Sequence, residues 1–351
     1  MKKILLVCIL AAYGAVAQAA EHKPAGSHHK RVAAHHVKAA HHAAAHHGRH
    51  HVKLAAVHHA RHTVVQHVQR IREAEPTRVA VKFDNELSGA SFQPASSPKL
   101  ASSIALIYDE QTQRPLYTKN PDAVAPIASI TKLMTAMIVL DSDPDLNEEL
   151  SVDVADLDIL KGTHSRLGVG TTFIRSEMLK LALMSSENRA ASVLARSYPG
   201  GTAAAIAAMN AKARKLGMLN TTFRDPTGLN SANVSTARDL VKMVSAARNY
   251  KLIHQYTTTA THLVEGQRGR ELIFNNTNPL VKNASWEIGV SKTGFINEAG
   301  RCLVMQANIR HRPVIIVLLD SVGKTTRIGD ANRVKKWIES SNTHGRVVRR
   351  G

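Results

Sequence analysis

The chain has 351 residues, of which 46 are lysine or arginine, 27 are aspartate or glutamate and 20 are histidine, so its formal net charge is +19. Such a basic balance usually indicates an anionic partner. Nucleic acid is not expected as that partner, because only 4% of the residues are aromatic and none is interleaved with the basic runs.

The first 19 residues have the three parts of a secretory signal peptide. Lys2 and Lys3 form a cationic start, residues 4–12 form a short apolar core, and Ala17-Gln18-Ala19 is a small-residue cleavage site. The apolar core is too short to span a membrane, and no other stretch could serve as a transmembrane anchor after signal cleavage. We therefore expect an exported, periplasmic protein.

Residues 20–75 form a low-complexity segment rich in histidine, alanine, lysine and arginine. Fifteen of the 20 histidines precede residue 70, and large apolar side chains are almost absent, so we expect disorder. The spacing of the histidine pairs varies, which fits neither a fixed repeat nor a structural zinc site.

Three interpretations of this segment stay open. It is a solvated spacer, it binds transition metal ions weakly through clustered imidazoles, or it is a polycation that holds the protein against anionic envelope polymers. The charge of the polycation would rise below about pH 6.5, where histidine protonates. The candidate metal-binding histidines are His28, His29, His35, His36, His41 and His42.

Residues 76–98 are rich in Ser, Pro, Gly and Asn and are expected to be a linker. Residues 99–342 have normal apolar content and are enough for one well-buried domain. Residues 343–351 form a short basic tail.

The expected elements of this domain are strands at both ends and helices between them. A β-hairpin is predicted at 103–118, a helix begins near residue 129, and further helices are predicted at 176–183, 190–196, 202–216, 236–249 and 325–340. The later strands are predicted at 286–292, 300–309 and 313–320. We therefore expect an α+β fold whose antiparallel sheet is completed from both termini of the domain.

The mature chain keeps one cysteine, Cys302, in the strand predicted at 300–309. A single thiol cannot form an internal disulfide. Its apolar neighbours indicate a buried, unreactive side chain.

Ser129 and Lys132 are three residues apart and therefore share one face of the predicted helix. The surrounding residues are apolar, so the lysine should be buried. Burial lowers the pKa of a lysine, and a neutral amine can activate a neighbouring serine as a nucleophile.

Two further motifs follow in the chain. Ser186-Glu187-Asn188 ends an apolar run, and Lys292-Thr293-Gly294 lies within a predicted strand. The order Ser-x-x-Lys, Ser-x-Asn, Lys-Thr-Gly is that of the penicillin-recognising serine acyltransferases.

The segment 100–341 resembles the low-molecular-weight penicillin-binding proteins, which are serine D,D-peptidases of the bacterial cell wall. The stretches 126–137, 181–191 and 292–305 resemble the D-alanyl-D-alanine endopeptidase branch beyond the bare motifs. The resemblance implies a β-lactamase/transpeptidase-like fold with a helical subdomain and an active site between the sheet edge and the helices. It also implies peptidoglycan peptide stems as substrates, β-lactams as covalent inhibitors, and no metal or organic cofactor in the catalytic domain.

By this resemblance Ser129 is the nucleophile and Lys132 its base, and the chemistry asks for the same residue types. Ser186 would relay a proton toward Lys132, and the amide of Asn188 would hold a substrate carbonyl. The expected oxyanion donors are the backbone N–H groups of Ser129 and Phe295.

The Lys-Thr-Gly motif would form the third wall of the site. Lys292 would keep Lys132 unprotonated by charge repulsion and, with Thr293, attract a carboxylate. Gly294 would let an extended peptide lie against the strand edge.

A class A β-lactamase shares the three motifs but hydrolyses its acyl-enzyme with a water held by a glutamate. No glutamate occurs between Asn188 and Glu265, and Asp225 is the one carboxylate near the expected place. We therefore expect slow deacylation.

Three other functions remain as alternatives: a D,D-carboxypeptidase, a catalytically silent wall-binding module, and a metal-handling protein with an attached enzyme. The chain ends soon after its last predicted helix, without the additional C-terminal β-domain of many carboxypeptidases of this family, which favours the endopeptidase.

Overall fold

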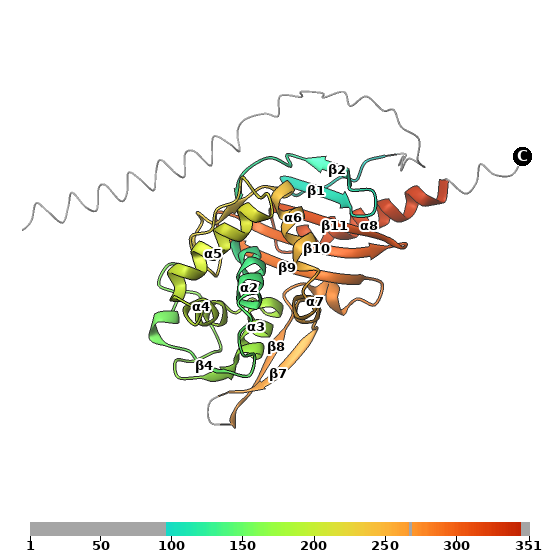
Figure 1. Ribbon diagram of the computed structural model, residues 1–351. Coiled ribbons are helices and arrows are strands. Elements are labelled where there is room, and N and C mark those ends of the chain that lie inside the picture. Colours follow the sequence, from blue (N-terminus) through green and yellow to red (C-terminus); the bar gives the residue numbers. More distant parts are fainter. Residues whose placement is uncertain (1–95, 267–268, 345–351) are drawn as a thin grey trace, which may run out of the picture. The chain divides into compact units, whose positions relative to one another are not determined.

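The computed structural model describes residues 96–266 and 269–344 (Figure 1). The predicted signal peptide 1–19, the histidine-rich segment 20–75 and most of the linker 76–98 lie outside the described residues, as does the end of the basic tail. Ser96, assigned to the linker, contacts the domain, because its carbonyl accepts a hydrogen bond of 2.6 Å from Trp337 Nε1.

A five-stranded antiparallel sheet forms the centre of the fold, with the strand order β2-β1-β11-β10-β9. β1 pairs with β11 from Ile104↔Leu319 to Asp109↔Val314, so the first and last strands are neighbours. This pairing confirms a sheet completed from both ends of the domain. The strands are β1 (Ile104–Asp109), β2 (Arg114–Lys119), β9 (Glu287–Ile296), β10 (Gly300–Ile309) and β11 (Arg312–Ser321).

Side chains alternate between the two faces of this sheet, as strand geometry requires. Ile104 and Leu106 of β1 belong to one apolar core and Ala105 and Ile107 to a second. The second core is covered by α8 (Thr326–His344), which Figure 1 shows on the opposite side of the sheet from α6. The sheet is therefore buried on both faces.

The helices between β2 and β9 pack against the first core. They are α2 (Thr131–Asp141), α3 (Arg175–Met184), α4 (Asn188–Arg196), α5 (Gly201–Lys215), α6 (Ala237–Ala247) and α7 (Lys251–Thr257), and the 3-10 turns are η1 (Ala128–Ile130), η2 (Val154–Asp156) and η4 (Pro279–Lys282). Predicted helix and strand boundaries agree with these within a few residues, except that β9 and α8 each continue four residues beyond the prediction. The structure thus confirms the α+β class.

Three short ladders and α7 were not predicted from the sequence. The ladders pair β3 (Ala125–Pro126) with β6 (Val234–Ser235), β4 (Glu149–Ser151) with β5 (Thr172–Ile174), and β7 (Thr261–Glu265) with β8 (Glu271–Asn275). Strands of two or three residues have no measurable period, so only their distant partners define them.

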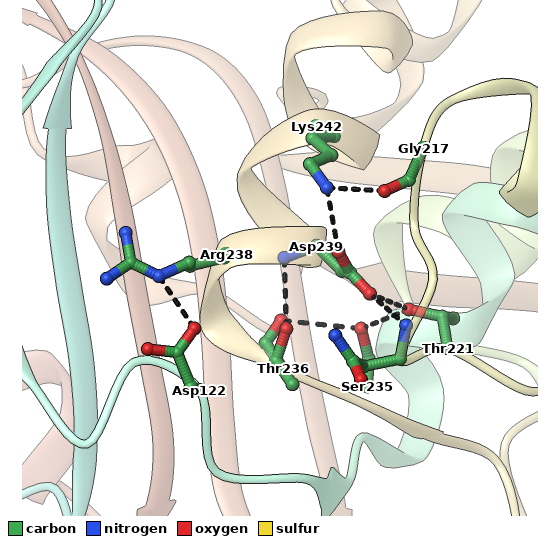
Figure 2. Close-up of polar contacts among 9 residues, drawn as sticks. Asp122, Gly217, Thr221, Ser235, Thr236, Arg238, Asp239 and Lys242 are labelled. Carbon is green, nitrogen blue, oxygen red and sulfur yellow. Dashed lines mark hydrogen bonds and ion pairs between the residues drawn. The ribbon is translucent and has the colours of Figure 1, made fainter.

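The start of α6 anchors the segment that leads to the candidate site (Figure 2). Thr236 caps the helix by accepting a hydrogen bond from the backbone N–H of Asp239. The buried carboxylate of Asp239 accepts hydrogen bonds from Asn220 N at 2.8 Å and from Thr221 Oγ1 at 3.0 Å. These contacts fix the loop between α5 and β6, which also contains Asp225.

Within the residues that the structure describes, no helix combines the length and the apolar character needed to cross a membrane.

Candidate active site

Ser129 lies in the 3-10 turn η1, directly before α2. The preceding residue, Ala128, has φ of +48°, a conformation that non-glycine residues rarely adopt. Two glycines pack against this turn. A Cβ atom on Gly228 would lie 1.9 Å from the Ala128 carbonyl oxygen, and one on Gly294 would lie 2.9 Å from the Ile127 carbonyl oxygen. The strained turn is therefore held from both sides by backbone.

Lys132 follows one turn later and is 1% exposed. Its Nζ atom lies 2.9 Å from Ser129 Oγ, 2.7 Å from Asn188 Oδ1 and 2.7 Å from the carbonyl oxygen of Thr227. A neutral amine has two N–H donors and one lone pair. Because the amide and carbonyl oxygens only accept, they take the two N–H groups, and the lone pair faces the Ser129 hydroxyl.

Burial lowers the pKa of Lys132 to about 7, while the carboxylates of Asp225 and Glu187 oppose this shift. The amine is thus available as a base near neutral pH. We predicted that burial and repulsion from Lys292 would both lower this pKa, and burial is the largest cause.

Lys292 is equally buried, at 1% exposure. Its Nζ atom donates to Ser186 Oγ at 2.9 Å and to the Thr293 carbonyl oxygen at 2.9 Å. Burial lowers the pKa of Lys292, and the charges of Lys132 and Arg327 lower it further. The repulsion between the two ammonium groups is mutual and disfavours the state in which both lysines are protonated.

Ser186 and Asn188 come from the turn between α3 and α4. Ser186 has φ of +64°, and its hydroxyl pairs with Lys292 rather than with Lys132, so the predicted direct bridge to Lys132 is not formed. The amide of Asn188 accepts from Lys132 and donates to Thr163 Oγ1 at 2.9 Å. The Oδ1 atom of Asn188 thus orients the base, while its Nδ2 atom has a second N–H group besides the one given to Thr163, so the contact with a substrate carbonyl stays a prediction.

The third wall of the site is β9, the outer strand of the sheet. Thr293 Oγ1 donates to Thr277 Oγ1 at 2.7 Å. A Cβ atom on Gly294 would meet Ile127, Ala128 and the Ser129 backbone nitrogen. Glycine is therefore required here by close packing on the turn that carries Ser129, an origin that differs from the substrate contact we predicted.

A cleft of about 580 Å³ opens over Ser129. Six of the predicted residues line it: Ser129, Ser186, Asn188, Thr293, Gly294 and Phe295. Lys132 and Lys292 lie behind this lining. The sequence did not reveal the other lining residues, which are Lys161, Thr163, Leu229, Thr277, Ile296, Asn297, Arg301 and Arg327.

Arg327, on α8, is the most unusual of the residues that sequence reasoning missed. Its side chain is 8% exposed, and its Nε atom is the one buried side-chain nitrogen or oxygen without a hydrogen-bond partner in residues 96–266 and 269–344. Buried polar atoms are usually paired. Arg327 and Arg301 both bring a guanidinium group to the lining of the cleft.

Asp225 supports Lys132 through the loop 225–230. One carboxylate oxygen accepts hydrogen bonds from the backbone N–H groups of Thr227 and Gly228, and the other from those of Leu229 and Asn230. The loop thereby presents the carbonyl oxygen of Thr227 to Lys132. Both carboxylate oxygens are occupied, so Asp225 is not free to act as the base for a hydrolytic water.

Cys302 lies in β10, is fully buried and donates a weak hydrogen bond of 3.4 Å to the Ala299 carbonyl oxygen. Burial raises the pKa of its thiol to about 12, so the thiolate is not accessible. In the described part of the chain, no group of three or more His, Cys, Asp or Glu side chains could hold a metal ion.

Comparisons with known proteins agree with this site. The family described as D-alanyl-D-alanine carboxypeptidase matches residues 91–323. A D-alanyl-D-alanine endopeptidase of Pseudomonas aeruginosa is 51% identical over 243 residues, which cover 69% of this chain and 78% of that protein. A D-alanyl-D-alanine endopeptidase of Escherichia coli is 50% identical over 252 residues, covering 72% and 81%.

The crystal structure of the Streptomyces K15 DD-transpeptidase superposes with a TM-score of 0.65 at 29% identity, over 70% of this chain and 100% of that chain. This likeness confirms the β-lactamase/transpeptidase-like fold. Because the family match covers most of the chain, and two relatives share about half of their aligned residues with it, the chain belongs to the D-alanyl-D-alanine carboxypeptidase family of serine D,D-peptidases.

Proposed function

We propose that the protein is a serine D,D-endopeptidase that cleaves D-alanyl cross-links in bacterial peptidoglycan through an acyl-enzyme on Ser129. The observation that carries this proposal is the buried amine of Lys132, whose lone pair faces the Ser129 hydroxyl at 2.9 Å on the floor of an open cleft. The two relatives that are half identical to this chain are both named D-alanyl-D-alanine endopeptidases, which favours cross-links as the substrate.

The reaction begins when Ser129 Oγ attacks the D-alanyl carbonyl and Lys132 takes its proton. The negative charge on the carbonyl oxygen is stabilised by the backbone N–H groups of Ser129 and Phe295. When the amide C–N bond breaks, Lys132 returns the proton to the leaving amine. Water then attacks the ester, and Lys132 accepts the proton of this water and returns it to Ser129.

For the hydroxyl of Ser186 we keep the predicted part of a proton relay, now by way of Lys292. It accepts from Lys292 and lines the cleft, so it can carry a proton between the leaving amine and the two-lysine site. The positive charges of Arg327, Arg301 and Lys292 favour a substrate with a carboxylate beside the scissile amide. Cross-linked stems and free D-Ala-D-Ala ends both have such a carboxylate.

A D,D-carboxypeptidase that removes terminal D-alanine is therefore the second candidate, and the family as a whole takes its name from that activity. The decisive experiment is a digest of a purified cross-linked muropeptide dimer mixed with a free pentapeptide monomer, with products resolved by mass. Monomers released from the dimer, with the pentapeptide intact, are expected. Loss of terminal D-alanine alone would establish the carboxypeptidase.

Ser129→Ala is the control for this digest. It should give no product and should not be labelled by a fluorescent penicillin. Product formation by Ser129→Ala would show that the nucleophile is wrong. If the wild-type protein gave no product from either substrate, the silent wall-binding module would replace the enzyme.

β-Lactams should inhibit the enzyme covalently, because they acylate the same serine and the site has no free carboxylate to hold and activate a hydrolytic water as a class A β-lactamase does. Asp225 is occupied by backbone hydrogen bonds, and no glutamate lies between Asn188 and Glu265. Rapid, sustained turnover of nitrocefin would contradict this proposal and indicate a β-lactamase.

For the N-terminal regions we propose export to the periplasm by the signal peptide 1–19, and retention at anionic envelope polymers by the polycation 20–75. Metal binding by His28, His29, His35, His36, His41 and His42 is the competing proposal. Calorimetric titration of the segment with zinc and copper tests it, and heat no greater than that of a scrambled peptide would exclude it.

A further inference from the structure

Four residues of loop 163–167 each contact the Ser186-Glu187-Asn188 motif or Arg189, the residue that follows it. Thr163 accepts a hydrogen bond from Asn188. Ser165 Oγ donates to Glu187 Oε2 at 2.6 Å, and Arg166 Nη2 contacts Glu187 Oε1 at 3.3 Å. The Leu167 carbonyl oxygen accepts from Arg189 at 2.6 Å. The loop therefore lies along the motif and is bonded to it at successive positions.

Glu187, the middle residue of the motif, lies at the N-cap of α4 but makes no capping hydrogen bond with its side chain. Its carboxylate turns toward loop 163–167 instead, and the side chain is 8% exposed. Burying a carboxylate is unfavourable unless it is paired and hydrogen-bonded. The partners that meet this requirement, Ser165 and Arg166, both belong to the loop.

Arg166 extends the same contact to the hairpin of β7 and β8. Its Nη1 atom donates to the Ile273 carbonyl oxygen at 2.5 Å, and its guanidinium lies 3.8 Å from the centre of the Phe274 ring. One planar guanidinium thus joins β8 to Glu187. Ser186, next to Glu187, is held in its strained conformation with φ of +64°, which persists only where the surroundings enforce it.

We propose that Arg166 and Glu187 are positioning residues that hold Ser186 and Asn188 in their catalytic geometry and set the electrostatic environment of the base. This inference rests on the proposed function of the Ser129 site and adds a role for Glu187, the variable middle position of the Ser-x-Asn motif, and for Arg166, which lies outside the three motifs; neither lines the cleft. The charged groups that face Lys132 are Asp225, Glu187 and Lys292, so a change at Glu187 should reach the base.

The test is the second-order rate constant of acylation by a fluorescent penicillin, measured from pH 5 to 9. Glu187→Gln keeps the shape of Glu187 but removes its charge; its amide oxygen can accept from Arg166, while its NH2 group would donate to Ser165 Oγ in place of the bond that Ser165 now donates. Because that charge favours protonated Lys132, the acid limb of the profile should move to lower pH. Arg166→Met leaves the Glu187 charge without its cation, so the acid limb should move to higher pH.

Misplacement of Ser186 and Asn188 should also lower the plateau rate of Arg166→Met by roughly tenfold or more, since small displacements of catalytic groups are costly. Arg166→Lys keeps the positive charge but lacks the planar guanidinium, which can bind two partners at once. It should restore the pH midpoint of the wild type but only part of the plateau rate. A purely structural role would lower activity without moving the midpoint.

Arg248 and Glu110 provide a matched control. Their side chains form an ion pair of 2.8 Å and are 45% and 8% exposed, the same values as for Arg166 and Glu187. Neither lines the cleft. Arg248→Met and Glu110→Gln should leave both the plateau rate and the midpoint unchanged.

The inference is supported if the pH midpoint of the acid limb moves in opposite directions in Glu187→Gln and Arg166→Met and stays unchanged in the two control variants. Unmoved midpoints in folded Glu187→Gln would overturn it even if Arg166→Met failed to fold. Wild-type protein that is not acylated at Ser129 would instead overturn the proposed function, so the two failures are distinguishable.

Discussion

Lys132 shows how burial alone changes the acid–base behaviour of a side chain. The side chain is 1% exposed, and the loss of hydration brings its pKa from 10.5 to about 7 against the pull of two carboxylates. The same ammonium on a solvated helix face would stay protonated and could not serve as a base. The two oxygen atoms that can only accept, Asn188 Oδ1 and the Thr227 carbonyl oxygen, then leave the lone pair of Nζ to the Ser129 hydroxyl.

The acylation rate should therefore depend on pH with an acid limb. Lys132 is protonated below its pKa and neutral above it, so the rate constant for acylation by penicillin should be constant well above pH 7 and fall roughly tenfold per unit well below it. Stopped-flow fluorescence across this range measures the limb. A rate that stayed flat between pH 5 and pH 8 would exclude Lys132 as the titrating base.

Gly228→Ala tests the packing behind the nucleophile. Gly228 has φ of +86°, and an added Cβ atom would lie 1.9 Å from the Ala128 carbonyl oxygen. The clash should destabilise the protein by about 3 kcal/mol or more and displace Ser129. Thermal unfolding and penicillin labelling measure the two effects.

Gly162→Ala is the matched control, because its φ of +61° is also positive but no atom lies within 4 Å of the added Cβ atom. It should lose only about 1–2 kcal/mol from backbone strain. Equal losses in both variants would show that steric contact with the η1 turn does not matter.

At the scale of elements, loops rather than helices keep the catalytic groups in position relative to one another. The loop 225–230 is organised by one aspartate and supplies the Thr227 carbonyl oxygen to Lys132. The loop 163–167 supports Asn188. The edge strand β9 brings Lys292 to Ser186. A rigid sheet and buried helices give these loops fixed ends.

Asp239 on α6 should contribute to this fixation, as the contacts in Figure 2 show. Asp239→Ala removes a carboxylate that is 2% exposed and leaves the backbone N–H of Asn220 without its acceptor. The free energy of unfolding should fall by about 2–4 kcal/mol. Urea denaturation measures this loss.

Arg238→Ala, on the neighbouring residue, breaks a pair with Asp122 whose side chains are 49% and 69% exposed. Solvent screening limits its expected effect to about 1 kcal/mol. If this variant lost as much stability as Asp239→Ala, burial would not be the reason for the importance of Asp239.

At the scale of the whole molecule, the residues in the three motifs belong to one domain, while the segment 20–75 carries nine of the 46 lysine and arginine residues and 15 of the 20 histidines. We expect the two to act separately. Deleting residues 20–75 should leave the rate of acylation by penicillin unchanged and reduce sedimentation with purified cell-wall sacculi. Equal sedimentation of the full and shortened chains would exclude a retention role for the segment.

A second variant separates the lysine and arginine charges from the histidines. Substituting glutamine for His28, His29, His35, His36, His41 and His42 should leave binding at pH 7.5 unchanged. It should reduce the gain in binding on acidification to pH 5.5, where these imidazoles would carry charge.

The sequence by itself determined the class of fold and the chemistry of the nucleophile. Long strands and helices were predictable because their apolar patterns extend over many residues, and the Ser129–Lys132 pair was predictable because three residues of helix place both on one face. The β3–β6 and β4–β5 ladders were not, since strands of two or three residues have no period; the five-residue strands of the β7–β8 hairpin and the seven-residue α7 have only a weak one.

Tertiary structure decided which partner each catalytic side chain has. Ser186 pairs with Lys292, Asn188 with Lys132, and Thr227 enters the site without belonging to any motif. It also placed Arg327 of α8 at the cleft. These contacts join elements that are far apart in the sequence. The burial that sets the pKa of Lys132 arises only when those elements pack together. Neither the distances between the catalytic groups nor the desolvation of Lys132 can therefore be predicted from a local sequence pattern.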